Sequence, residues 1–385
     1  MKIGETYANY CGVKLPQDPA PPFCAYYPML GEYITVHNGS GMPAKNYDYY
    51  REVLEVIRKA RPDLKVVQIG LPEEMLLPNV VDLRGKTNLY QCNYIVKESK
   101  LHIGNDSVWA HNAGIYGTPL VVPYGPTLAN VCAPLYHTED SVFIDSHRDG
   151  NRPSHSPVEE DKTINLIKPE EVANAALGIL GEKPSKRETL FVGERYHTSA
   201  VEIVPDHIIP HALFQGIPLN IRVDLGEPTI EAMTYYMTQR QCTWVIDKTI
   251  DPNSIKQSAQ NISCIMYKVA KDTFEIDYVK ALASTGVDYL VITENEDDLP
   301  DLKFQLLNYN APKLRKPPEP LEGDFSGCLF KSSKVIASDG KFYLSEWHFN
   351  NQQPIPSLEE NIALFPEDPD GSFWIDKSHF YIYKN

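Results

Sequence analysis

A short strand that runs directly into a helix constrains the fold of this 385-residue chain more than any other feature. Leu101–Gly104 is an apolar run of strand length, and three residues of the types that begin helices follow it: Asn105, Asp106 and Ser107. The pattern then predicts a helix over 108–116. Free N–H groups at the start of such a helix form an anion site at the carboxyl edge of a parallel sheet, where a phosphate would fit. A turn of this kind can also do no more than cap its helix.

The end of this predicted helix is marked as clearly as its start. Gly117 tolerates the left-handed conformation that ends many helices, and Pro119 prevents the helix from continuing. Leu120–Val122 then starts a second buried strand. The stretch therefore predicts a strand–helix–strand unit, which is typical of α/β proteins with parallel sheets.

Several motifs over residues 5–182 follow one another in the order of a known enzyme family. They are Gly85-Lys86-Thr87-Asn88-Leu89, Gly104-Asn105-Asp106-Ser107, His111, Gly117-Thr118-Pro119 and Tyr124-Gly125-Pro126-Thr127, with a glycine-rich loop over 36–47 and the segment 66–74 before them and a helix over 164–180 after them. In this order they resemble the carboxyl-terminal, nucleotide-sugar-binding half of the ADP-heptose:lipopolysaccharide heptosyltransferases, a GT-B glycosyltransferase family. The resemblance implies a metal-independent hexosyl or heptosyl transfer from a nucleotide-diphosphate sugar to a glycan or other hydroxyl acceptor, without a cofactor.

The resemblance places the donor site in two loops, which we expect to grip the same diphosphate. In the loop 38–45, glycines let the backbone pass close to a ligand, and the closing lysine neutralises the diphosphate. A lysine at a helix start is, however, more often a solvated surface residue. A histidine one turn into the helix after 104–108 can touch the ligand or be a buried structural residue. The donor-binding candidates of the two loops are Ser40, Gly41, Lys45, Asn105, Asp106, Ser107 and His111.

A carboxylate is expected to bind the ribose of the donor. Lys65–Ile69 alternates as a buried strand, and the turn Gly70-Leu71-Pro72 then presents Glu73 or Glu74. A carboxylate at the end of a parallel strand is well placed to accept hydrogen bonds from ribose hydroxyls. Glu73 is predicted for this role, with Glu74 as the alternative.

The sequence departs from the family pattern at two points. Val108 follows Ser107 where the family usually has glycine, and a side chain there narrows the approach of the backbone to a phosphate. The family's amino-terminal domain, which carries the acceptor site and a catalytic acid, precedes a linker that residues 1–30 resemble, yet Met1 stands almost at that linker. We therefore expect a second α/β domain to replace it.

Under this expectation, the loop after the strand pattern 219–223 is the first place to look for the catalytic base. Asp224 and Glu227 are the candidates, although Pro228 at a helix start favours a capping role for them. Two other classes stay open. The chain can be a non-catalytic nucleotide-sugar-binding or scaffold protein, or one subunit of a split transferase whose partner subunit supplies the other half.

Four segments are expected, which together give an α/β fold: a Rossmann-like GT-B donor domain, then a second α/β domain with a β-rich C-terminal extension. They are an extended leader (1–30), the nucleotide-sugar-binding domain (31–184), a second Rossmann-like domain (185–312) and the extension (313–385). Strand and helix patterns alternate over 219–293. Strands are predicted over 327–336, 341–348 and 372–383, with Asp339-Gly340 as a hairpin turn, and an exposed loop over 137–162.

Composition excludes several classes of protein. The net charge of −15 argues against nucleic acid as a partner, because binding phosphates requires a basic surface. Seven cysteines without a Cys-x-x-Cys pair indicate free thiols in a reducing compartment, and we expect a cytoplasmic protein without a transmembrane segment. His137, His147 and His155 lack the spacing of metal ligands, so no metal is expected.

Overall fold

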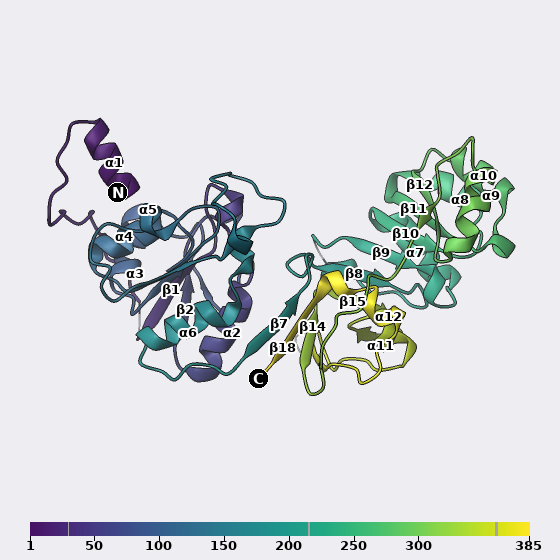
Figure 1. The fold of residues 1–385 in the computed structure, drawn as a ribbon. Helices are drawn as coiled ribbons and strands as arrows, with labels where there is room; N and C mark the ends of the chain where they lie inside the picture. Colours follow the sequence, from purple (N-terminus) through teal and green to yellow (C-terminus); the bar gives the residue numbers. More distant parts are fainter. Residues whose placement is uncertain (30, 215, 359–360) are drawn as a thin grey trace. The chain divides into compact units, whose positions relative to one another are not determined.

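The computed structural model describes residues 1–29, 31–214, 216–358 and 361–385. Leu30, the last residue of the expected leader, lies outside this part. The chain divides into two compact units, the first made of Met1–Thr189 with Asn385 and the second of Leu190–Lys384. Both units are α/β structures (Figure 1).

The first unit is built on a six-stranded sheet in the order β3-β2-β1-β4-β5-β6, in which all neighbours are parallel. The strands are β1 (Tyr33–His37), β2 (Lys65–Gln68), β3 (Val81–Asp82), β4 (His102–Gly104), β5 (Leu120–Tyr124) and β6 (Val142–Asp145). From β1 the chain proceeds to one edge of the sheet, and from β4 to the other. This is the order of doubly wound Rossmann-like sheets, and it confirms the α/β fold expected from the sequence.

Helices cover both faces of this sheet. Figure 1 shows α2 and α6 on one face and α3 and α4 on the other. The helices are α2 (Tyr50–Ala60), α3 (Leu89–Lys97), α4 (Val108–Tyr116), α5 (Ala129–Cys132) and α6 (Pro169–Ile179). Ile95 of α3 and Trp109 of α4 belong to one buried cluster with Val67 and Val122 of the sheet. The predicted helix over 108–116 is confirmed, and Gly117 ends it with a left-handed φ of 70°.

The second unit is built on an eight-stranded sheet in the order β13-β12-β11-β10-β9-β8-β15-β16. All neighbours are parallel except the β15–β16 hairpin. The strands are β8 (Ala200–Ile203), β9 (Leu219–Arg222), β10 (Cys242–Ile246), β11 (Ile262–Lys268), β12 (Tyr289–Thr293), β13 (Lys313–Leu314), β15 (Lys334–Ser338) and β16 (Lys341–Tyr343). The connecting helices are α7 (Ile230–Gln239), α8 (Pro252–Gln257), α9 (Ile276–Ala283) and α10 (Leu299–Gln305).

Besides the eight-stranded sheet, the structure has a four-stranded sheet in the order β17-β14-β18-β7. Its strands are β7 (Glu188–Val192), β14 (Leu329–Ser332), β17 (Ile362–Leu364) and β18 (Phe380–Lys384), and β14 is antiparallel to β17 and β18. The short helices α11 (Glu346–Asn350) and α12 (Gly371–Trp374) lie in the same part of the chain. An aromatic cluster that includes Phe330, Phe373 and Phe380 forms the core here.

Several expected elements were wrong in type or extent. The leader contains a helix, α1 (Ile3–Tyr10), because its prolines begin only at Pro16. Within the expected loop 137–162, β6 forms the edge of the sheet, and its short run of three apolar residues was hidden among polar neighbours. The strand predicted over 341–348 ends at Tyr343 and is followed by α11, which Ser345 caps through its side chain. The strand predicted over 372–383 begins only at Phe380.

Candidate functional site

The first unit has its topological switch point between β1 and β4. In the parallel register His37 lies opposite Gly104, and the next N–H along, that of Asn105, donates to the His37 carbonyl at 3.3 Å. The loops that follow the two strands therefore leave the sheet side by side. Ligands of doubly wound sheets bind at this kind of place, outside the carboxyl ends of the strands.

Asn105 ties the two loops together. Its Oδ1 accepts hydrogen bonds from the Tyr47 N–H at 3.2 Å and from the Tyr50 hydroxyl at 2.8 Å. Its Nδ2 donates to Oδ1 of Asn46 at 3.3 Å, and the side chain is buried. These contacts fix the geometry of the loops from inside, whereas a direct contact of Asn105 with a donor stays a prediction.

Lys45 and Asp106 form an ion pair across the two loops. The ammonium Nζ lies 2.6 Å from Oδ2 of Asp106, and the two side chains are 16% and 7% exposed. The Thr127 hydroxyl donates to the same oxygen at 3.3 Å, and Nε2 of His111 lies 3.7 Å from Oδ1. Burial acts to raise the pKa of Asp106, but the contacts with His111 and Lys45 outweigh it and hold the pKa below its usual value. The Asp106 carboxylate is therefore charged at neutral pH.

Ser107 stands at the N-cap of α4 without capping it. Its hydroxyl makes no hydrogen bond to the N–H groups of the helix and instead pairs with Nδ1 of His37 at 3.1 Å. Nε2 of His37 lies 3.3 Å from Oε1 of Glu74, and these two side chains are 6% and 14% exposed. The edge of the Trp109 indole packs near the imidazole, with 6.4 Å between ring centroids. The result is a serine–histidine–glutamate chain beside a helix start whose N–H groups have no side-chain cap.

The Glu74 carboxylate lies against the backbone of two glycines. A Cβ on Gly39 would stand 2.2 Å from Oε1 of Glu74, and one on Gly70, where φ is +137°, would stand 2.0 Å from Oε2. Oε2 is buried and has no hydrogen-bond partner among the described residues. A buried oxygen in this condition calls for an additional donor, such as a water or ligand group. Glu73, the residue favoured from the sequence, is exposed.

The remaining donor-site candidates lie in the open part of the first loop and on α4. Oγ of Ser40 donates to the Met42 carbonyl at 2.7 Å and so closes a local turn around Gly41. Gly41 is exposed, and a Cβ there would meet no atom within 4 Å. The His111 side chain is 42% exposed. The structure therefore brings Lys45, Asp106, Ser107 and His111 together, while their contacts with a donor stay predictions.

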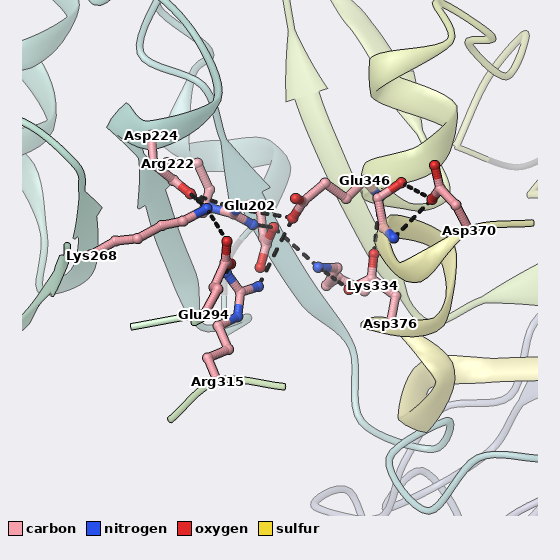
Figure 2. Close-up of polar contacts among 11 residues, drawn as sticks. Glu202, Arg222, Asp224, Lys268, Glu294, Arg315, Lys334, Glu346, Asp370 and Asp376 are labelled. Atoms are coloured by element: carbon pink, nitrogen blue, oxygen red, sulfur yellow. Dashed lines mark hydrogen bonds and ion pairs between the residues drawn. The ribbon is translucent and has the colours of Figure 1, made fainter. Parts of the chain in front are cut away.

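The two candidate catalytic bases lie in the second unit and differ sharply in environment. The Asp224 side chain is fully buried, and its two oxygens accept hydrogen bonds from Nε and Nη2 of Arg222 at 2.8 and 2.9 Å (Figure 2). Glu227 is 94% exposed and lies 3.2 Å from Nζ of Lys248. The contacts of Asp224 favour a structural ion pair over proton transfer, and no contact of Glu227 favours catalysis.

Two residues of the site were not singled out from the sequence: His37 and Thr127. His37 ends a buried apolar strand and directly precedes Asn38-Gly39, a position from which a polar side chain reaches the sheet edge. This position at the end of a strand is the sequence signal that could have identified His37 as a site residue. Among the described residues, no group of three or more His, Cys, Asp or Glu side chains is arranged to hold a metal ion. In the same part of the chain, every helix is too short or too polar to cross a membrane.

Comparisons with known proteins give a partial likeness in fold. No family model and no curated protein matches the chain. Among solved structures, it is similar to a glycosyl transferase family 9 protein from Veillonella parvula, with 23% identity, a TM-score of 0.31, and coverage of 46% of this chain and 50% of that one. It is also similar to an ADP-heptose lipopolysaccharide heptosyltransferase II from E. coli, with 21% identity, a TM-score of 0.32, and coverage of 47% of this chain and 52% of that one. For the iron-containing glycosyltransferase TibC from enterotoxigenic E. coli, the identity is 17%, the TM-score is 0.36, and the match covers 44% of this chain and 50% of that one. The chain thus spans about half the length of these proteins.

Proposed function

We propose that the chain is a glycosyltransferase whose first unit binds a nucleotide-diphosphate sugar. One observation carries the proposal: the loops after β1 and β4, which match a donor-binding motif order in sequence, converge at the switch point and are joined by the Lys45–Asp106 pair at 2.6 Å. The structure could have placed them on opposite faces of the sheet or left the lysine in solvent. Their meeting supports a single diphosphate site.

In this proposal each part of the site has a task. The first N–H groups of α4, which Ser107 leaves uncapped, hold a phosphate oxygen, and the helix dipole favours its negative charge. Lys45 and His111 lie beside this helix start and add positive charge or hydrogen bonds to the diphosphate. The unpartnered Oε2 of Glu74 accepts a hydrogen bond from a ribose hydroxyl.

The chemistry follows from the charge on the leaving group. Transfer of the sugar releases a nucleoside diphosphate, and donors fixed before the reaction stabilise the developing charge best, since they need no reorganisation. In the metal-independent mechanism that the sequence resemblance implies, helix N–H groups and Lys45 supply these donors. A base must also accept the proton of the acceptor hydroxyl. The acceptor is a glycan or another hydroxyl compound.

The experiment is a comparison of nucleotide binding by two lysine variants. ADP, UDP and GDP are titrated into the wild-type chain, Lys45→Met and Lys162→Met. Lys162 is a matched control, because it too forms a partly buried pair in the first unit, 2.7 Å from Asp48 with 23% and 14% exposure. A nucleotide at about 100 times its Kd should stabilise the wild type by about 2.7 kcal/mol. The stabilisation should be lost in Lys45→Met and kept in Lys162→Met.

Two results would contradict the proposal. Either none of the three nucleotides stabilises the wild-type chain, or both variants keep the full effect. Nucleotide binding without any turnover of nucleotide-sugars, in contrast, would select the second candidate function, a non-catalytic nucleotide-sugar-binding protein or a subunit that needs a partner. One observation favours this candidate: of the two predicted bases, Asp224 is engaged by Arg222 and Glu227 is a surface residue.

A further inference from the structure

We propose that the second unit has a sugar-binding site at the carboxyl edge of its eight-stranded sheet. A pocket of about 420 Å³ opens where β10, β11 and β12 end. This volume lies within the range of small-molecule sites, and the carboxyl edge of a parallel sheet is where such sites occur. The polar residues that line the pocket are Asp247, Lys268, Thr273, Thr293, Glu294 and Asn295.

The charged groups in the pocket wall are held in place before any ligand arrives. Oε2 of Glu294 lies 2.9 Å from Nζ of Lys268, and Oε1 lies 3.3 Å from Nη1 of Arg315. Each carboxylate oxygen thus has its own cation (Figure 2). Lys268 is also 3.9 Å from Oδ2 of Asp224, and this oxygen accepts a hydrogen bond from Nη2 of Arg222. This arrangement gives Asp224 the task of a positioning residue behind the pocket.

Asp247 is an exposed acidic residue of the pocket lining. It follows β10 directly, is exposed, and makes no hydrogen bond or ion pair with any other residue in the described part of the chain. Its carboxylate is therefore available to accept hydrogen bonds from a ligand, and hydrogen bonds to a charged acceptor are about twice as strong as neutral ones. Among the lining residues it is the acidic group without an internal partner.

The charge of the wall selects the class of ligand. Glu294 lies between two cations, Lys268 and Arg315. Lys268 also lies 3.9 Å from Asp224, and Arg315 lies 3.9 Å from Glu346, so each cation is already shared by two carboxylates. Asp247 is the acidic residue of the lining without a cation of its own among the described residues. A phosphate or carboxylate ligand would be repelled, because no cation in the wall is left over for it. A neutral ligand rich in hydroxyl groups can donate to both carboxylates. The pocket therefore fits a monosaccharide or a short glycan.

This inference rests on the proposed function in one respect, namely that the bound sugar is taken to be part of the acceptor. The sugar site and the nucleotide site lie in different units, so each can be tested separately in the same full-length sample. A failure of nucleotide binding with intact sugar binding would overturn the proposed function alone. A failure of sugar binding with intact nucleotide binding would overturn the inference alone.

The experiment is saturation-transfer NMR on the full chain with glucose, galactose, mannose and N-acetylglucosamine as probes, and with inorganic phosphate in competition. We expect at least one sugar to bind, phosphate not to compete, and affinity to fall about tenfold or more in Asp247→Asn and in Asp247→Asn/Glu294→Gln. Asp277→Asn is the control, since that carboxylate on α9 is 87% exposed and lies outside the pocket lining. The single variant removes an exposed group without internal contacts and so keeps the test valid if the double variant does not fold.

Four results would overturn the inference. None of the four sugars binds, or a sugar binds equally well to the wild type and to Asp247→Asn, or inorganic phosphate displaces the bound sugar. Equal loss of binding in Asp277→Asn would likewise show that general surface charge, and not the pocket, is responsible.

Discussion

His102 should make the first unit sensitive to mild acid. This residue of β4 is fully buried beneath the candidate site, with Nδ1 3.0 Å from the Thr35 hydroxyl and Nε2 without a hydrogen-bond partner among the described residues. Burial, with a smaller contribution from the nearby His37, lowers the pKa of His102 to about 3. The imidazole is therefore neutral in the folded protein over the whole range in which a free histidine gains its proton.

The magnitude follows from the difference between the folded and unfolded states. An unfolded histidine has a pKa of about 6.5, so between this value and about 3 the unfolded chain binds one proton more than the folded chain. The free energy of unfolding then decreases as the pH falls, by about 1.4 kcal/mol per pH unit. Above the unfolded pKa the imidazole is neutral in both states, so His102 does not lower the free energy of unfolding there. Between pH 6.5 and pH 5 the loss is about 2 kcal/mol, a large share of the stability of an ordinary domain.

The assay must report on the first unit alone, and the tryptophans allow this. Of the four tryptophans, only Trp109 lies in the first unit. Fluorine NMR of 5-fluorotryptophan protein therefore follows urea unfolding of this unit through one resonance. His102→Asn keeps an acceptor for the Thr35 hydroxyl but does not titrate, and His147→Asn, at a 64% exposed side chain, is the control.

We expect the pH slope of the unfolding free energy between pH 6.5 and pH 5 to decrease by about 1.4 kcal/mol per unit in His102→Asn and to stay unchanged in His147→Asn. The slope is compared rather than the absolute stability, since shortening a buried side chain has a cost of its own. An identical slope in the wild type and in His102→Asn would refute the reasoning, because it would mean that His102 gains its proton in the folded protein.

Three further changes have defined outcomes. Gly125→Ala should destabilise the first unit by about 1–3 kcal/mol in the fluorine assay, because its Cβ would overlap the backbone of Ile164, whereas Gly41→Ala, in open space, should not; equal effects would contradict this. Arg222→Met should lower the unfolding free energy of the second unit by about 3–5 kcal/mol, since its buried acidic partners lose their cation, and an unchanged melting temperature would argue against the network. His37→Asn should weaken ADP binding about tenfold in a calorimetric titration. Unchanged affinity would show that the imidazole does not contribute to nucleotide binding.

Much of the fold was predictable, because local signals and the tertiary structure agree. The apolar run at 120–122 forms the start of strand β5, and helix α4 ends at Gly117, as the sequence predicts. The Asp339-Gly340 turn is confirmed as a hairpin, with left-handed φ values of 48° and 71° between paired residues Ser338 and Lys341. A two-residue turn of this kind requires positive φ, which Asp and Gly tolerate best.

Long-range pairing and side-chain partners were not predictable. β15 lies beside β8 although about 130 residues separate them, and no local pattern encodes which strand a parallel neighbour selects. The choice between Glu73 and Glu74 stays a prediction. The structure places Glu74 beside His37 and leaves Glu73 exposed, a difference that two adjacent acidic loop residues do not show in the sequence. Asp224 reads as a strand-end acid in the sequence, and the buried Arg222 beside it becomes its partner only in the folded unit.

The first unit contains several polar groups whose hydrogen-bonding capacity is not met inside the protein. Of the four buried side-chain atoms without hydrogen-bond partners in the described part of the chain, three belong to this unit: Oε2 of Glu74, Nε2 of His102 and the hydroxyl of Tyr124. Ser107 adds a helix start that forgoes a side-chain cap, which ordinarily contributes about 1 kcal/mol. A fold tolerates such losses where another requirement opposes stability, and binding sites are the usual case. Because Glu74 and Ser107 both contact His37, a ligand that satisfies the carboxylate and the helix N–H groups together would recover both losses at one place.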